Sequence, residues 1–318
     1  MKKKIIILGA TGFIGKNTVE LFKNLKQFEV YGTYFKKIPR KDPNIKYLKA
    51  DLTCKSDVSK CLKGKDYVVQ AAAVTGGLKD ARKNAIKYIS DNAVINSNVL
   101  DCSIKHKIKH FIFLSCTLMY KSSFKPQREK DLNLNEKMHP GYFGGAWNKI
   151  YIEKICQYYS DISNTKFTVL RHSNVYGPND KYDLDKSHLF AATIKKVLDT
   201  KENSKIKIWG DGNQKRDIIY IDDLTNAIKL AIKNQKNKFE IFNIGSGKMI
   251  KVKDLVKKII SKSKKKLLIE YDLSKPSNTF FVSLDCKLAL KKIKWKNKTN
   301  IEKGIVKTIE WYKKYYRK

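Results

Sequence analysis

The chain has 318 residues, 42% of them hydrophobic, and its 67 Lys and Arg outnumber 30 Asp and Glu to give a formal net charge of +37. This length favours one large domain or two closely joined domains, and the hydrophobic content is that of a globular protein. No apolar run reaches the roughly 18 residues that a membrane-spanning helix needs, so we expect no membrane partner.

Lysines occur along the whole chain, from the run at 2–4 through 262–266 to the C-terminus. A nucleic-acid-binding protein more often concentrates its charge in one arm or on one face, so no nucleic-acid partner is predicted. We interpret the lysines as solvated helix faces, whose field also attracts anionic ligands such as nucleotides.

The cysteines and the N-terminus bear on location. The six cysteines form no CxxC pair and have no histidine at a metal-binding spacing, which predicts free thiols, no metal and a cytoplasmic protein. The apolar part of the N-terminal stretch "MKKKIIILG" is short and runs into a glycine turn, which favours a first strand over a signal peptide.

Strands and helices alternate in the first half of the chain. Strands are expected at 4–9, 28–34, 45–50, 66–72, 110–115 and 166–171, and the clearest helices at 80–105 and 146–160. Continuous apolar strands separated by amphipathic helices predict an α/β fold, a doubly wound parallel sheet of the Rossmann type.

We expect this dinucleotide-binding domain to span residues 1–175, and residues 176–318 to form mainly a smaller C-terminal α/β lobe for the substrate. Further elements are expected as a helix near 187–199, strands at 217–221 and 239–244, and a C-terminal amphipathic helix. The segments near 217–245 should cross back to extend the sheet.

The stretch "ILGATGFIG" places Gly9, Gly12 and Gly15 between the first strand and a helix. Glycines there permit a tight turn and bring a pyrophosphate close to the free amides of the helix N-terminus. The predicted cofactor-binding residues are Gly9, Thr11, Gly12, Phe13, Ile14, Gly15, Lys36, Asp51, Leu52, Ala71, Ala72, Ala73 and Lys149.

The end of the second strand bears on the choice of dinucleotide. NAD binding usually needs an acid there to hold the ribose diol. This segment instead offers Lys36, Lys37 and Arg40, cations that suit a 2′-phosphate. We therefore favour NADP(H), with NAD(H) as the alternative.

Several motifs in this order resemble the extended short-chain dehydrogenase/reductase family, also called the NAD-dependent epimerase/dehydratase family. They are "GATGFIG", "QAAAVTGG", "DNAVINSNVLDCS", "RHSNVYGP", "RDIIYIDDL" and "FNIGSG". Within it, "AAAVTGG", the Ser187–His188 pair and "IWGDGNQKRDIIYIDDL" are similar to the GDP-fucose synthase subgroup. The resemblance implies a GDP-sugar or related nucleotide-sugar substrate, a Rossmann fold and a homodimer built from the helices at 80–105 and 146–160.

In this family a tyrosine four residues before a lysine transfers the proton, and the lysine lowers the pKa of that tyrosine. Lys149 matches the lysine, at the start of a helix and followed by Glu153, but Gly145 stands at the tyrosine position. The position of the Ser or Thr that polarises the oxygen falls on Cys116, followed by Thr117.

Three explanations remain open for the missing tyrosine. Tyr142 is brought in by a local rearrangement, or Thr117 or Cys116 carries the proton with help from Lys149 or water. In the third, catalysis is lost and the protein is a silent binding relative.

The resemblance also bears on the reaction and the substrate. The epimerisation cysteine of the subgroup aligns with Leu118, which cannot move protons, whereas its histidine is present as His188. This pattern favours C4 oxidation or 4-keto reduction of a GDP-(deoxy)hexose or GDP-heptose for bacterial surface polysaccharide, with an epimerase or dehydratase as the alternative. The expected substrate-binding residues are Asn174, His188, Lys196, Trp209 and Arg216.

Overall fold

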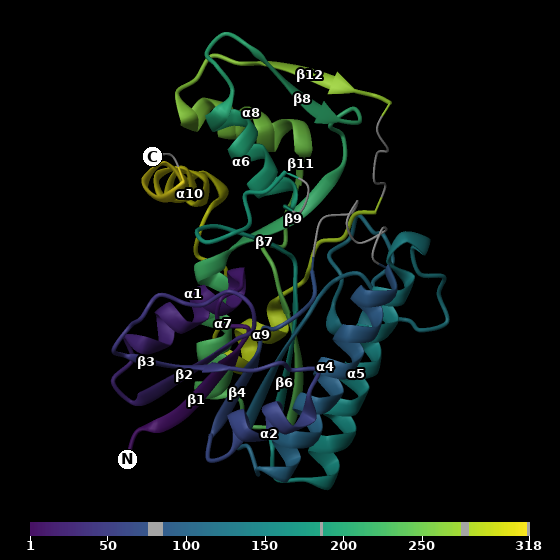
Figure 1. Cartoon of the computed structure of the whole chain (residues 1–318). Helices are drawn as coiled ribbons and strands as arrows, with labels where there is room; N and C mark the ends of the chain where they lie inside the picture. Colours follow the sequence, from purple (N-terminus) through teal and green to yellow (C-terminus); the bar gives the residue numbers. More distant parts are fainter. Residues whose placement is uncertain (76–84, 185–186, 275–279, 317–318) are drawn as a thin grey trace.

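The computed structural model describes residues 1–75, 85–184, 187–274 and 280–316, and a seven-stranded parallel sheet forms its centre (Figure 1). The strand order is β10-β6-β5-β4-β1-β2-β3, so β1 and β4, which frame the glycine turn, are neighbours. The strands are β1 (Lys3–Leu8), β2 (Phe28–Tyr34), β3 (Ile45–Lys49), β4 (Tyr67–Gln70), β5 (His110–Ser115), β6 (Lys166–His172) and β10 (Phe239–Ile244). The Rossmann-type fold class predicted from the sequence is confirmed.

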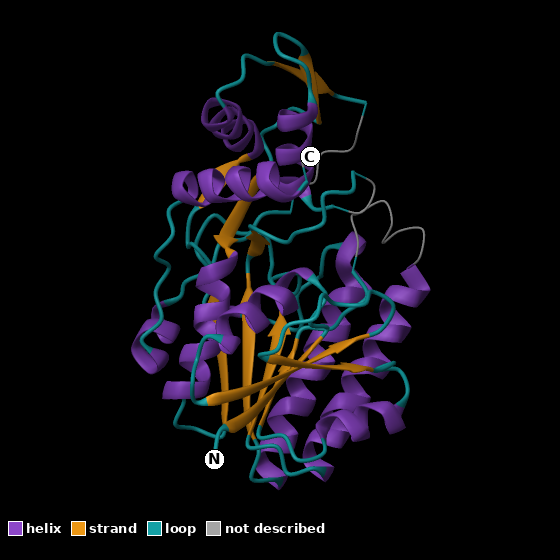
Figure 2. Cartoon of the chain, turned by 60° about the vertical axis from the view of Figure 1, so that its left-hand side comes forward, coloured by secondary structure: helices purple, strands orange, loops and turns teal. Residues whose placement is uncertain are grey.

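Helices cover both faces of this sheet, as Figure 2 shows. One face carries α2 (Lys55–Leu62), α4 (Ala85–Lys105) and α5 (Phe143–Ile162), and the other carries α1 (Phe13–Lys23), α7 (Ile221–Asn234) and α9 (Lys287–Ile293). Two short 3₁₀ helices, η1 (Glu129–Asp131) and η2 (Pro140–Tyr142), lie in the segment between β5 and α5. Because both faces are covered, the strands are apolar along nearly their whole length.

Two small sheets and three helices form the upper part of the molecule in Figure 1. The sheets have the orders β11-β9-β7 and β12-β8. Their strands are β7 (Asn174–Tyr176), β8 (Lys205–Trp209), β9 (Lys215–Tyr220), β11 (Met249–Lys251) and β12 (Leu268–Asp272), and the helices are α6 (Leu189–Asp199), α8 (Val252–Ser263) and α10 (Ile301–Tyr315).

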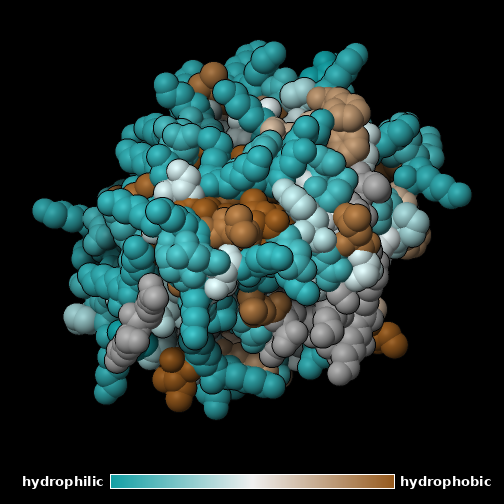
Figure 3. All heavy atoms as spheres, turned by 90° about the horizontal axis from the view of Figure 1, so that it is seen from above, coloured by the Kyte–Doolittle hydropathy of each residue, from teal (hydrophilic) through white to brown (hydrophobic). Residues whose placement is uncertain are grey.

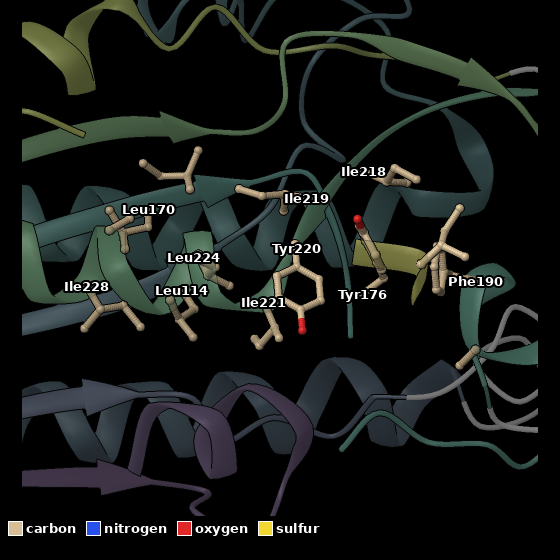
Figure 4. Close-up of a cluster of buried hydrophobic side chains, with 14 of the residues drawn as sticks. Leu114, Leu170, Tyr176, Phe190, Ile218, Ile219, Tyr220, Ile221, Leu224 and Ile228 are labelled. Carbon is tan, nitrogen blue, oxygen red and sulfur yellow. The ribbon is translucent and has the colours of Figure 1, made fainter. Parts of the chain in front are cut away.

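One hydrophobic core connects the large sheet with the upper part. Figure 4 shows Leu114 and Leu170 of the large sheet in the same cluster as Tyr220 of β9 and Phe190 of α6. The rings of Tyr176 and Phe190 stack with their centroids 4.0 Å apart. This shared core fixes the position of the upper elements over the carboxyl ends of the strands.

The structure differs from the sequence prediction at three places. Of the two strands expected to extend the sheet, β10 pairs with β6, but β9 joins β7 and β11 in a separate sheet. The helix expected from 146 begins at Phe143, so Lys149 lies in its second turn and not at its start. The third strand ends at Lys49, before Asp51. Residues 76–84 lie outside the described residues. They include the end of the motif "QAAAVTGG" and the start of the helix expected at 80–105.

The glycines explain the early start of α5. A Cβ atom on Gly144 would lie 2.2 Å from Ile89 Cδ1, so the glycine lets the first turn pack against this α4 side chain without a shift. Glycine is a poor helix former, so local preference disfavours a helix at these residues. The tertiary contact with α4 outweighs that local preference.

The surface reflects the lysine-rich composition. Figure 3 shows hydrophilic side chains over most of the upper face, with hydrophobic side chains near its middle. Within the described residues, no helix is both long and apolar enough to cross a membrane.

Candidate active site

The turn between β1 and α1 has the geometry of a phosphate-binding loop. Gly9 has a positive φ of 75°, and a Cβ atom on it would lie 2.7 Å from Ala72 Cα. A Cβ atom on Gly15 would lie 2.1 Å from the Gly9 carbonyl oxygen. Gly12 is the N-cap of α1 and makes no side-chain cap, and the first turn holds no acid. Its amides are therefore free to bind an anion, and the site fits a dinucleotide pyrophosphate.

The other predicted cofactor residues surround this turn. Asp51 Oδ1 accepts hydrogen bonds from the Thr53 amide and hydroxyl, and Leu52 is buried. The Ala71 amide donates to the Leu8 carbonyl, which continues the β1–β4 pairing to the edge of the sheet. Partly or fully accessible in this region are Thr11, Gly12, Phe13, Ile14, Ala71, Ala72 and Ala73.

A cluster of cations lies where the second ribose of a dinucleotide would be held. Burial, followed by the charges of Lys37 and Arg40, lowers the pKa of Lys16 in the first turns of α1, against an opposing effect of Glu20. Lys36 is exposed and lies over the ring of Phe35. Lys16 is the member of this group that the sequence prediction missed, because it lies on the helix and not on β2.

Lys149 is fixed at the carboxyl end of β5. Its Nζ atom donates to the Leu114 carbonyl oxygen at 2.7 Å and lies 4.5 Å from the centre of the Phe113 ring. Burial lowers the pKa of Lys149, against the opposing charges of Cys116 and Glu153. The side chain is therefore a positioned ammonium whose proton is easier to remove than that of an ordinary lysine.

Cys116 and Thr117 follow β5 directly, as the sequence predicted. Burial raises the pKa of the Cys116 thiol, and the charge of Lys149 opposes this only in part. Thr117 is buried, and its carbonyl accepts the amide of Tyr120. Cys116 lies near the Lys149 ammonium and is in its uncharged form at neutral pH.

Two histidines complete this edge of the sheet, and one of them was missed by sequence reasoning. His172 ends β6, and its Nδ1 lies 2.9 Å from the Ser173 carbonyl oxygen. Burial is the main cause that lowers the pKa of His172 to about 4, and the charges of Lys149 and His188 contribute. His188 is the N-cap residue of α6, and burial and Lys181 lower its pKa. The signal for His172 lay in the motif "RHSNVYGP", where it follows the buried Arg171.

Tyr142 lies at the junction of η2 and α5. Its ring packs against His139, with the centroids 5.0 Å apart, and against Phe280 at 5.5 Å. It is also an electrostatic partner of Arg216, whose pKa is lowered by burial. The structure thus brings Tyr142 to the side of the site where β9 and the segment at Phe280 meet.

The predicted substrate residues lie in the upper part. Arg216 donates to the carbonyls of Lys215 and Phe280. The Asp217 carboxylate accepts hydrogen bonds from the amides of residues 246, 247 and 284. Trp209 is 49% exposed, so its ring is accessible at the surface.

Two further predicted substrate residues make contacts with backbone. Lys196 Nζ donates to the Lys207 carbonyl of β8, and Asn174 Nδ2 donates to the Asp217 carbonyl. Both side chains are therefore used in holding the upper elements together. Their predicted role in binding a substrate stays a prediction.

No group of three or more His, Cys, Asp or Glu within the described ranges could hold a metal ion. The polar groups at the carboxyl edge of the sheet are thus a lysine, a thiol and two histidines beside a glycine-rich phosphate turn. This set can bind a dinucleotide and move a proton at a nearby oxygen.

A comparison with protein-family models matches residues 5–245 to the NAD dependent epimerase/dehydratase family. The chain belongs to this family. Membership supports an enzyme that uses a nicotinamide dinucleotide, and it confirms the resemblance that the sequence motifs indicated.

Curated relatives from this family are similar over most of their length. GDP-L-colitose synthase of Yersinia pseudotuberculosis is 29% identical over 314 residues, which cover 97% of each chain. GDP-L-fucose synthase of Sinorhizobium fredii is 32% identical over 267 residues, covering 82% of this chain and 84% of the relative. Both are named as GDP-sugar enzymes.

Solved structures of the epimerase/dehydratase type share the fold. MoeE5 in complex with UDP-glucuronic acid and NAD superimposes with a TM-score of 0.84 at 19% identity, covering 98% of this chain and 99% of that chain. UDP-glucose 4-epimerase of Thermotoga maritima gives a TM-score of 0.83 at 24% identity, covering 99% and 100%. At these identities the likeness concerns the fold alone.

Proposed function

We propose that this member of the epimerase/dehydratase family is an NAD(P)-dependent oxidoreductase acting on a GDP-sugar. The reaction is oxidation at C4, or reduction of a 4-keto group, in a GDP-(deoxy)hexose or GDP-heptose destined for a surface polysaccharide. The observation that carries the proposal is Lys149, held by the Leu114 carbonyl at the carboxyl edge of the sheet beside an intact phosphate turn. Ligands of open α/β sheets bind at this edge.

The dinucleotide would be held by the turn of Gly9, Gly12 and Gly15 through the amides of α1. The nicotinamide supplies or accepts the hydride when bound. Lys149 would hold the ribose of the dinucleotide and contact the sugar oxygen. Cys116 and Thr117 directly follow β5, the strand whose Leu114 carbonyl accepts a hydrogen bond from Lys149.

The GDP-sugar would extend over the upper part. The exposed Trp209 ring can stack on the base or ribose, and Arg216 can reach a phosphate once its contacts with the Lys215 and Phe280 carbonyls exchange for the ligand. The names of the relatives, GDP-L-colitose and GDP-L-fucose synthases, support guanosine as the nucleoside.

Leu118 favours simple redox chemistry over epimerisation. An epimerase must remove and return a proton at a ring carbon, and an alkyl side chain cannot do this. His188 alone remains of the pair that the GDP-fucose synthase subgroup uses. An epimerase is the alternative because the similar relatives are synthases of GDP-L-sugars.

The first prediction tests the reaction. Purified protein mixed with NAD(P)H and GDP-4-keto-6-deoxymannose or a GDP-4-ketoheptose should oxidise the NAD(P)H and so lower the absorbance of the reduced nicotinamide. The product should carry the transferred hydrogen at C4. In deuterated water no deuterium should enter a ring C–H bond. Deuterium at C3 or C5 would show that the protein is an epimerase. If hydride were transferred to none of the ketosugars tested, the protein would be a catalytically silent binding relative.

The second prediction concerns the cofactor. We propose a preference for NADP(H), because Lys16, Lys37 and Arg40 lie close together at the site of the second ribose. Lys37→Ala and Arg40→Ala should each raise the Kd for NADPH by about 5–50-fold, or about 1–2 kcal/mol, and change the Kd for NADH less than twofold.

Fluorescence titration of the reduced dinucleotides measures these constants. Lys41→Ala is the matched control, since Lys41 is an exposed neighbour outside this cluster. Equal losses for NADH and NADPH in the two variants would contradict a 2′-phosphate site.

A homodimer is part of the proposal. Large apolar side chains are exposed on α4 and on α5, which lie side by side on one face of the sheet (Figure 1). They are Ile86, Ile89, Val94, Phe143, Trp147, Tyr151, Tyr158 and Ile162. Exposed apolar side chains on two neighbouring helices fit a protein–protein interface.

A further inference from the structure

The structure offers a proton donor that does not require the missing tyrosine. Gly145 and Lys149 are four residues apart on α5, so they lie on the same helix face. Among the described residues, and apart from its own helix and its chain neighbours, the only heavy atom within 4 Å of a Cβ placed on Gly145 is Leu118 Cδ1, at 3.9 Å. A Cβ at 145, on the same helix face as Lys149, would therefore be almost uncrowded by the described residues.

The contrast with Gly144 shows that this openness is specific to position 145. A Cβ on Gly144 would lie 2.2 Å from Ile89 Cδ1, so this side chain of α4 would have to shift. A Cβ on Gly145 would require no such shift among the described residues.

The Lys149 ammonium is oriented for this role. One N–H group donates to the Leu114 carbonyl at 2.7 Å, and the Phe113 ring lies on another side with its centre 4.5 Å from Nζ. An ammonium has three donors, so hydrogen-bonding capacity remains for a substrate oxygen.

We propose that Lys149 itself exchanges the proton with the sugar oxygen, and that the open space at Gly145 admits this oxygen to the ammonium. The inference rests on the proposed function and names the group that performs its proton transfer. In the reducing direction, a bound nicotinamide would supply the hydride for the new C–H bond. The carbonyl π electrons move to the oxygen, which takes a proton from Nζ. Lys149 is left as a neutral amine, which regains its proton from solvent before the next turnover.

The surroundings agree with proton exchange at Nζ. Burial lowers the pKa of Lys149, which brings the ammonium closer to the working range of an acid. The charged and titratable groups that face it are Cys116 at the end of β5, Glu153 on α5, and His172 at the end of β6. Glu153 is bound by Arg171, and burial outweighs the opposing effects of Cys116 and Glu153, so the pKa of Lys149 stays lowered.

The decisive experiment compares variants of Lys149. Turnover should fall about 10²–10⁴-fold in Lys149→Ala and by a similar factor in Lys149→Arg, since a guanidinium keeps its charge but does not release its proton. Added methylamine or ethylamine should restore Lys149→Ala at least tenfold. Lys154→Ala, an exposed lysine on the same helix, is the matched control and should turn over as the wild type does.

The pH profile has a defined sign. Ketone reduction needs the ammonium, so kcat/KM should fall as pH rises through the pKa of Lys149, below the ordinary value for lysine. Brief acetylation of the free protein across pH 6–11, followed by peptide mass spectrometry, measures that pKa without turnover, since only the neutral amine reacts. An ordinary lysine value would overturn the proposal.

A second pair of variants tests the open space. Gly145→Phe should lower turnover at least 100-fold while the Kd for the dinucleotide changes less than threefold, and Gly145→Ala should lower turnover much less. Turnover of the wild-type protein tests the proposed function. The Lys149 and Gly145 variants test whether Lys149 is the proton donor. The inference is overturned if Lys149→Arg keeps more than a third of the activity. It is equally overturned if Tyr142→Phe loses 100-fold, which would assign the proton to that hydroxyl as the sequence predicted.

Discussion

Glu153→Gln and Arg171→Met should each lower the free energy of unfolding by about 3–5 kcal/mol. The two side chains form an ion pair in which Arg171 donates to Glu153 Oε2 at 2.6 Å, and both are only 4% exposed. Either substitution leaves a buried charge without its partner, which is the costly case for a salt bridge in the interior. Urea denaturation followed by circular dichroism measures the change.

The same pair holds the strand ends around the site. Ser115 donates to Glu153 from the end of β5, and Arg171 donates to the Tyr120 hydroxyl, which in turn donates to Asn243 of β10. Burial raises the pKa of Tyr120 to about 12, so it stays a neutral donor throughout the physiological range. The network therefore joins β5, β6, β10 and α5, one turn after Lys149.

The double variant Glu153→Leu/Arg171→Met separates charge burial from packing. Removing both charges should restore much of the stability lost in either single variant, because a buried ion pair contributes little net stability. Lys258→Met, which breaks the more exposed pair with Glu302, is the control and should cost at most about 1 kcal/mol. Single variants within 1 kcal/mol of the wild type would show that the pair is solvated in solution.

The large sheet could be predicted from the sequence because its strands are continuous apolar runs. β2 and β5 begin and end where the periodicity placed them, at Phe28–Tyr34 and His110–Ser115. β9 was expected in the wrong sheet, because its apolar residues predict a buried strand but not the strands with which it pairs. Its pairing with β7 and β11 is decided by contacts far apart in the chain.

The site residues that could be predicted from the sequence are mainly those that lie in recognisable motifs. Gly9, Gly15 and Lys149 lie within recognisable spacings, and the structure gives each a steric or hydrogen-bonding reason. His172 and Lys16 escaped notice because their significance lies in tertiary neighbours, namely Lys149 for the first and Lys37 for the second. For Tyr142 the sequence predicts a role in proton transfer but not where its side chain lies, and that role stays a prediction.

Gly15→Ala should be among the most damaging single-atom additions in the chain. Its Cβ would lie 2.1 Å from the Gly9 carbonyl oxygen and 2.8 Å from the Gly9 carbonyl carbon, and both are backbone atoms that no rotamer change can move away. The turn must open, at a cost of about 1–3 kcal/mol in stability. Because the turn also aims the α1 amides, the Kd for the dinucleotide should rise at least about tenfold, or 1.4 kcal/mol.

Gly12→Ala is the matched variant, since the two glycines share one motif but differ in their neighbours. A Cβ on Gly12 would have the Gly9 oxygen at 3.3 Å, and the extended φ of −79° suits any residue, so stability should change by less than about 1 kcal/mol. The added methyl still narrows the approach of a phosphate to α1, so dinucleotide binding should weaken in both variants. The free energy of unfolding should fall only in Gly15→Ala. Urea denaturation and fluorescence titration of the two variants measure these quantities separately. If Gly15→Ala were as stable as Gly12→Ala, the turn would not be held by the contact between residues 9 and 15.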